Sequence, residues 1–161
     1  MTTQPGRSHR LDAFPAAAVR FSRALDRNRE RIAEEEGLSA SELRALFFIG
    51  EHVSVTPKQL AAHMHLTTTA ITFISRRLVE IGMLHRVDHP DDRRKIFLEL
   101  TDDAHATVER IHLEFDEMVR NATSHLTDAQ VDDFTGYLQS VGTAVAEHTA
   151  RLSNGKSAAT I

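Results

Sequence analysis

The stretch TPKQLAAHMHLTTTAITFISRRLVEIG, residues 56–82, decides the fold, because it marks two successive helices joined by a short turn. Thr56 stands three residues before a glutamine, the reciprocal capping pattern that satisfies the free amides at a helix start. Pro57 then falls at the first helical position, where its missing N–H costs nothing. The stretch therefore predicts a short helix over 57–64 and a second helix over 68–81.

The second of these helices has an apolar face and an opposite polar face. At about 100° per residue, its apolar side chains fall in a narrow stripe that can pack on the preceding helix. The stripe consists of Ile71, Ile74, Leu78 and Ile81. The polar face suits a DNA major groove, since hydroxyls can meet base edges and an arginine can form paired hydrogen bonds with guanine. The alternative is that this polar face is merely solvated. The residues of the polar face are Thr68, Thr69, Thr72, Phe73, Arg76 and Arg77.

Phe73 is the unusual member of the polar face, because a phenyl ring at that position has no core to enter. The ring can contact the methyl groups of thymine in a major groove. It can also pack against the base of the hairpin that follows in the sequence. The sequence favours neither of these two interpretations.

Beyond this helix, the segment DHPDDRRK, residues 88–95, places three basic side chains after an acidic turn that contains proline. Apolar runs on both sides predict two short strands, about 84–87 and 96–100, joined as a hairpin with its tip at 89–93. Three helices followed by two strands predict a winged helix-turn-helix, a mainly α fold with a two-stranded β wing.

The hairpin tip is predicted to be a second DNA contact. An arginine at the tip can enter a narrow, electronegative minor groove while its basic neighbours hold phosphates. Carboxylates one or two residues away, Asp91 and Asp92, can hydrogen-bond the turn amides and orient the guanidinium before binding. The alternative is a polar hairpin whose charges pair locally and contribute ~0 to 1 kcal/mol. The basic residues are Arg93, Arg94 and Lys95.

Charge is unevenly distributed along the 161 residues, whose formal net charge is -4. Residues 57–95 carry seven basic and four acidic side chains, a net charge of +3, whereas residues 96–161 carry four basic and eleven acidic ones, a net charge of -7. The winged region is therefore the basic part of the chain.

The absence of cysteine excludes disulfides and thiolate metal sites. Without a membrane-spanning apolar run or a signal peptide, a cytoplasmic protein is expected.

Long helices are predicted on both sides of the winged region. One is expected over about 11–36, and a shorter helix over about 40–52 leads into the winged region. Two more are expected over about 102–124 and 128–151. Hydroxyl caps mark three of these helix starts, at Ser39, Thr101 and Thr127. The predicted organisation is a disordered N-terminus (1–9), an N-terminal dimerisation helix (10–37), a DNA-binding domain (38–100), C-terminal dimerisation helices (101–152) and a disordered tail (153–161).

The two C-terminal helices carry apolar residues at alternating three- and four-residue spacing, as helices packed lengthwise do. This is more apolar surface than a small winged domain can cover, so an intertwined homodimer is the economical arrangement. The alternative is an intramolecular three-helix bundle. The stripes are Ala104, Val108, Ile111, Phe115, Met118 and Ala122 in the first helix, and Val131, Phe134, Leu138, Val141 and Val145 in the second.

The segment from LSASELRALFFIGEH to TDDA resembles the winged-helix core of the multiple antibiotic resistance regulator (MarR) family of bacterial transcription factors. The DDRR wing, followed by a strand and a Thr-capped helix, is the most specific feature. The resemblance covers about Leu38 to Ile111. This sequence differs from many family members at two positions. Phe73 stands where many members have arginine, and His89 stands where aspartate often precedes the wing proline.

The resemblance implies a homodimer whose two winged domains bind successive major grooves of a pseudo-palindromic double-stranded DNA site. By motif position, the contacts from the recognition helix would be Thr67, Thr68, Thr69, Thr72 and Arg76. Arg93 would be the minor-groove arginine and Asp91 its brace. A small, often aromatic or amphipathic effector would bind between the dimer helices and the winged domain, near Phe47, Phe48 and His52.

Other functions have less support in the sequence. There is no nucleophile elbow, Gly-rich phosphate loop or HExxH motif, so neither an enzyme nor a cofactor is predicted.

The ten histidines raise the alternative of a metal-responsive regulator, since His105 and His112 lie on one helix face and can share a metal with Glu109. Solvent-exposed histidines are the simpler interpretation. An architectural DNA-binding protein is a further alternative. We favour a ligand-responsive, sequence-specific repressor.

Overall fold

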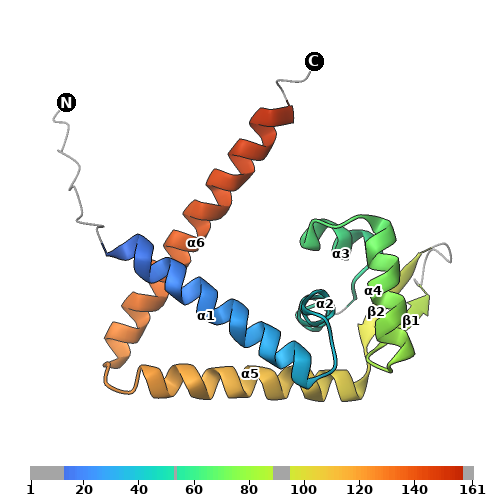
Figure 1. The fold of residues 1–161 in the computed structure, drawn as a ribbon, viewed down its shortest axis with the longest axis horizontal. Coiled ribbons are helices and arrows are strands. Elements are labelled where there is room, and N and C mark those ends of the chain that lie inside the picture. The colour runs from blue at the N-terminus through green and yellow to red at the C-terminus, as the bar shows by residue number, and fades with distance from the viewer. Residues whose placement is uncertain (1–12, 53, 89–94, 158–161) are drawn as a thin grey trace. The chain divides into compact units, whose positions relative to one another are not determined.

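The structure is a computed structural model that describes residues 13–52, 54–88 and 95–157. It is mainly helical with one small sheet, which confirms the predicted winged helix-turn-helix with long flanking helices (Figure 1). Within these residues, no helix combines the length and the apolar character that crossing a bilayer requires. The elements are α1 (Phe14–Glu35), α2 (Ala40–Gly50), α3 (Pro57–Met64), α4 (Thr68–Glu80), β1 (Leu84–Asp88), β2 (Ile96–Leu100), α5 (Asp102–Ala122) and α6 (Asp128–Ser157).

The helices begin where the sequence predicts caps. In each reciprocal cap, the hydroxyl of a Ser or Thr accepts a hydrogen bond from the backbone amide three residues later. The side chain of that later residue in turn accepts a hydrogen bond from the backbone amide of the Ser or Thr. The pairs are Ser39 with Glu42, Thr56 with Gln59, and Thr127 with Gln130. At α5, Thr101 Oγ1 accepts a hydrogen bond from the Ala104 amide at 3.2 Å. All four predicted helix starts are therefore confirmed.

The two strands form an antiparallel hairpin whose register runs from Leu84 opposite Leu100 to Asp88 opposite Ile96. Val55, between α2 and α3, adds a single bridge on the other side of β2, where the Leu98 amide donates to its carbonyl at 2.7 Å. This contact was not predicted, because one residue has no alternation pattern to detect. It ties the segment before α3 to the wing.

The core of the first compact unit, which comprises the residues up to His112, lies between α2, α3, α4 and the hairpin. Figure 1 shows α4 lying along the strands. The predicted α4 stripe is confirmed: Ile71 and Leu78 are fully buried, and its other two members are partly buried against them. The flanking helices contribute to the same core, α1 through Ile32 and Ala33, and α5 through Ala104, Val108 and Ile111.

The predicted end of the last helix was wrong. That helix was expected to stop near Arg151, with residues 153–161 as a disordered tail, but α6 continues to Ser157. Helix propagation adds one hydrogen bond per residue once a nucleus exists. The tail has no proline before 157, and Gly155 opposes the helix by only ~1 kcal/mol. The ends of α2 and α5 fall two residues earlier than predicted, at Gly50 and Ala122.

Candidate nucleic-acid interface

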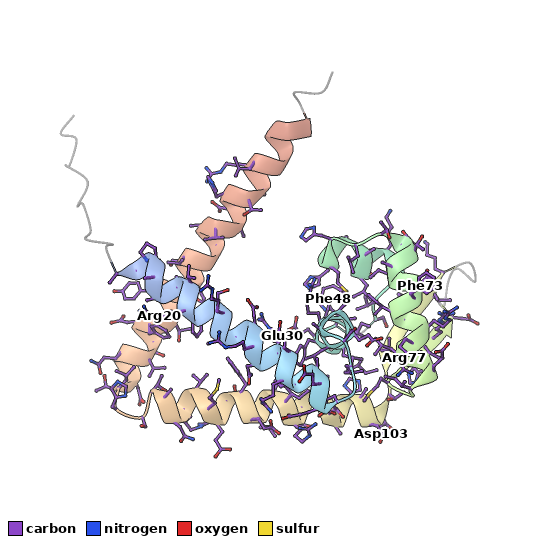
Figure 2. The ribbon with its side chains drawn as sticks, viewed as in Figure 1. Arg20, Glu30, Phe48, Phe73, Arg77 and Asp103 are labelled. Atoms are coloured by element: carbon purple, nitrogen blue, oxygen red, sulfur yellow. The ribbon has the colours of Figure 1, made fainter. Side chains whose placement is uncertain are left out.

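The outward face of α4 is exposed along the helix. Figure 2 shows Phe73 toward the end of α4 that follows the α3–α4 turn, and Arg77 about one turn further along. The structure thus places all the predicted α4 residues on one accessible surface, opposite the buried Ile71 and Leu78. These exposed residues are Thr68, Thr69, Thr72, Phe73, Arg76 and Arg77, with Thr67 just before them.

Two of the threonines on this surface also serve the helix itself. Thr67 is the N-cap of α4, since its Oγ1 accepts a hydrogen bond from the Ala70 amide at 3.2 Å. Thr72 Oγ1 donates to the Thr68 carbonyl one turn earlier at 2.9 Å. Thr67 therefore retains its O–H as a donor, and Thr72 retains hydroxyl lone pairs as acceptors.

Phe73, Arg76 and Glu80 form a cluster along the exposed side of α4. Phe73 is 58% exposed and lies outside the buried core. The guanidinium carbon of Arg76 lies 5.2 Å from the ring centroid, within the range of a cation–π contact. Nε of the same arginine lies 3.5 Å from a Glu80 carboxylate oxygen. The guanidinium is thus positioned by a ring on one side and a carboxylate on the other.

A hollow of about 600 Å³ lies where the starts of α3 and α4 meet the start of β2. Lys58, Lys95 and Thr68 line it together with Gln59. The positive ends of two helices and two ammonium groups favour a phosphate there. Lys95 was a predicted contact, but Lys58 was not. Its position directly after the capped start at Pro57 is the signal that would have identified it.

The predicted wing-tip residues Asp91, Arg93 and Arg94 lie outside the described residues. The minor-groove contact of Arg93, the phosphate contact of Arg94 and the bracing role of Asp91 remain predictions. The last paired positions of the hairpin, Asp88 and Ile96, mark where the tip segment begins and ends.

The sequence of this region matches the model of the MarR family over residues 38–96. Over these residues the chain carries the MarR-family domain. Two curated relatives agree with this assignment. The transcriptional regulator PecS of Dickeya dadantii is 26% identical over 127 residues, which cover 74% of this chain and 76% of PecS. The transcriptional repressor MdtR of Bacillus subtilis is 26% identical over 98 residues, which cover 61% of this chain and 63% of MdtR.

Solved MarR-family structures share the fold. A variant of MepR from Staphylococcus aureus superposes with a TM-score of 0.69 at 17% identity, covering 82% of this chain and 96% of MepR. Another MepR variant, solved bound to an oligodeoxyribonucleotide, superposes with a TM-score of 0.61 at 17% identity, covering 82% of this chain and 97% of that one. At these identities the similarity concerns the fold.

The three predicted effector residues have different surroundings in the structure. Phe47 lines a hollow of about 390 Å³ between α1 and α2, and its ring stacks on that of His112 with centroids 5.3 Å apart. Phe48 instead stacks on His63 of α3 at 3.9 Å and contacts His52 at 4.4 Å. His52 Nδ1 lies 2.7 Å from the Phe48 carbonyl oxygen. The structure therefore brings Phe48 and His52 together and separates Phe47 from them.

The histidines of the metal hypothesis have other surroundings. His112 stacks on Phe47, as described above, and His105 lines a separate hollow between the end of α2 and the end of β2. Across the described ranges, no three His, Asp or Glu side chains are grouped so that they could hold a metal ion. The metal-responsive alternative thus receives no support from the described part of the chain.

Proposed function

We propose that this MarR-family chain is a sequence-specific DNA-binding transcription regulator, a cytoplasmic repressor that binds a pseudo-palindromic operator as a homodimer. The observation that carries the proposal is the exposed face of α4, where Thr68 lines the hollow that Lys58 and Lys95 also line, and Thr72 and Arg76 are exposed further along the helix. Such a surface combines groups that contact base edges with cations that neutralise phosphates. The curated names of PecS and MdtR support regulation, and that of MdtR supports repression.

Exposed apolar side chains support the homodimer. In the single chain, a row of large apolar residues along α6 stays exposed, as do several near the start of α1. Water-soluble monomers rarely expose so much contiguous apolar surface, and a second copy with the same helical stripe can cover it. The exposed residues are Phe134, Tyr137, Leu138, Val141 and Val145 in α6, and Phe14, Val19 and Phe21 in α1.

The effector, if the chain responds to one, fits best in the hollow between α1 and α2. Phe47 lines this hollow together with Arg29 and Arg44, and with the carboxylates of Asp26 and Glu30. A small aromatic acid can stack on the ring and pair with a guanidinium. Such a ligand changes DNA binding only if it binds the DNA-competent and DNA-incompetent dimers unequally.

The test of DNA recognition is fluorescence anisotropy with two fragments of equal length, the DNA upstream of the chain's own gene and a scrambled version, at several salt concentrations. A regulator of its own gene should bind the native fragment ~1000-fold more tightly, with affinity falling steeply as salt rises. Equal affinity for the two fragments, and for every fragment of a genomic library, would instead indicate the architectural alternative.

A further inference from the structure

The exposed phenyl ring of Phe73 is the least explained feature of the α4 surface. It lies among hydroxyls and cations, it is 58% exposed, and it belongs to no core cluster of the described residues. Exposing such a ring to water is unfavourable, so a permanent or transient partner should cover it. Because its neighbours are groups that suit DNA, the partner is most economically the major groove itself.

The chemistry of the major groove limits what a phenyl ring can contact. Base edges there present donors and acceptors, which a phenyl ring cannot pair with. The C5 methyl group of thymine is the apolar exception. A ring that enters the groove beside thymine therefore buries apolar surface, whereas beside cytosine or a purine it leaves polar groups without partners.

Arg76 completes the contact, because its guanidinium is already oriented next to the ring. Its Nε faces Glu80 at 3.5 Å and its carbon lies 5.2 Å from the ring centroid. The edge formed by Nη1 and Nη2 is the one that can form paired hydrogen bonds with O6 and N7 of guanine. Fixing the side chain before binding reduces the rotamer freedom that binding would remove.

The spacing on the helix is compatible with contacts to neighbouring base pairs. Residues three apart on one face of a helix have Cβ atoms ~5 to 6 Å apart, and their side chains converge or diverge by a few ångströms. Successive bases are stacked ~3.4 Å apart along a strand. Phe73 and Arg76 can therefore reach neighbouring base pairs at the same time.

We propose that Phe73 is a specificity-determining residue that recognises the methyl group of a thymine, and that it acts jointly with Arg76 on a T·A pair adjacent to a G·C pair in each half-site. This inference rests on the proposed function, since it names the base step that the DNA-binding surface selects. Thr69 and Thr72 are exposed on the same side of α4 as Phe73 and would supply the polar contacts at the neighbouring positions.

The experiment begins with selection of binding sites from a library of random double-stranded DNA by the full-length protein. Each thymine of the selected site is then replaced singly by deoxyuridine, which lacks only the C5 methyl group, and the affinities are measured by anisotropy. Loss of one buried methyl group at the critical thymine should weaken binding about fourfold. That thymine should lie next to a G·C pair.

Protein variants assign the effect to the ring. Phe73→Ala should bind the thymine and deoxyuridine sites equally, while Phe73→Leu should retain part of the preference. The matched control is Leu113→Ala, which removes a similarly exposed apolar side chain of α5, outside both the α4 surface and the α5 stripe, and should keep the wild-type ratio. Urea unfolding of each variant checks that the fold is preserved.

Two results would overturn the inference while leaving DNA recognition intact: equal wild-type affinity for thymine and deoxyuridine at every position of a selected site, or an unchanged fourfold ratio in Phe73→Ala. If the library yields no preferred sequence at all, the proposed function fails, and the inference fails with it.

Discussion

The Oγ1 atom of Thr67 accepts a hydrogen bond from the backbone amide of Ala70 at 3.2 Å, so the residue that precedes the candidate recognition helix is also its cap. Removing the hydroxyl should cost about 1 kcal/mol of folding free energy, because one amide of the first turn loses its partner. We therefore expect Thr67→Ala to unfold at a lower urea concentration. Because the cap positions the whole helix, the affinity of the Thr67→Ala variant should fall by a similar factor for specific and scrambled DNA.

Thr67→Ser is the matched control, since serine caps helices as well as threonine does. It should restore both stability and affinity. A Thr67→Ala protein of wild-type stability would show that the cap contributes nothing. A loss of affinity confined to the specific site would instead assign Thr67 a direct contact with bases.

Arg76 is expected to contribute to specificity more than to general affinity. Arg76→Ala should cost ~1 to 3 kcal/mol of binding free energy on the specific site and much less on scrambled DNA, because a paired contact with guanine exists only at the correct base. Anisotropy on both DNAs measures the difference. Equal losses on the two DNAs would exclude Arg76 from base recognition and place it at a phosphate.

Arg93 should act at the sequence flanking the major-groove contact. Because narrow minor grooves in A·T-rich DNA attract an inserted arginine, Arg93→Ala should lose most affinity for operators with A·T-rich flanks. Replacing those flanks with G·C pairs should reduce the effect of the substitution. If the loss is the same for both kinds of flank, the residue contacts phosphates only. Lys95→Ala is a useful comparison, since a phosphate contact should weaken binding regardless of sequence.

Most of the winged domain could be predicted because its signals are local. Reciprocal caps at Ser39 and Thr56, and the stripe that contains Ile71 and Leu78, depend only on residues a few positions apart. The bridge between Val55 and Leu98 is different, because it joins residues far apart in the sequence without any repeating pattern. The end of α6 was missed since the residues near Ser157 neither favour nor strongly oppose a helix.

The candidate site was predicted in composition but not in arrangement. The sequence identified the exposed face of α4, yet the position of Arg76 between Phe73 and Glu80 depends on side-chain conformations. Phe47 and Phe48 were assigned to one pocket, although neighbouring residues in a helix point about 100° apart. The structure accordingly places Phe47 toward α1 and α5, and Phe48 toward α3.

His65, in the turn between α3 and α4, has a left-handed backbone conformation with φ of 53°. Non-glycine residues pay ~1 to 2 kcal/mol for that conformation, while glycine loses more chain entropy on folding. His65→Gly should therefore stabilise the fold by roughly 0.5 to 1 kcal/mol. Ala62→Gly, inside α3, is the matched control and should destabilise it by about 1 kcal/mol. Urea denaturation compares both, and a loss of stability in His65→Gly would contradict the strain argument.

The apolar stripe of α6 should hold the proposed homodimer together. Phe134 and Leu138 are 52% and 48% exposed in the single chain and lie one turn apart. Introducing a carboxylate at either position would bury an unpaired charge in the interface, which is costly. We expect Phe134→Asp and Leu138→Asp to sediment as monomers, or to show a dissociation constant raised at least 100-fold, and to bind the operator more weakly.

Thr143→Asp provides the control for these substitutions. At about 100° per residue, Thr143 falls on the face of α6 opposite the stripe, and its side chain is exposed. The same charge placed there should leave both the sedimentation coefficient and operator affinity unchanged. Dimers that persist in Phe134→Asp and Leu138→Asp would mean that the stripe of α6 lies outside the interface. A monomeric wild-type protein at micromolar concentration would contradict the homodimer itself, and with it the need for a two-fold symmetric operator.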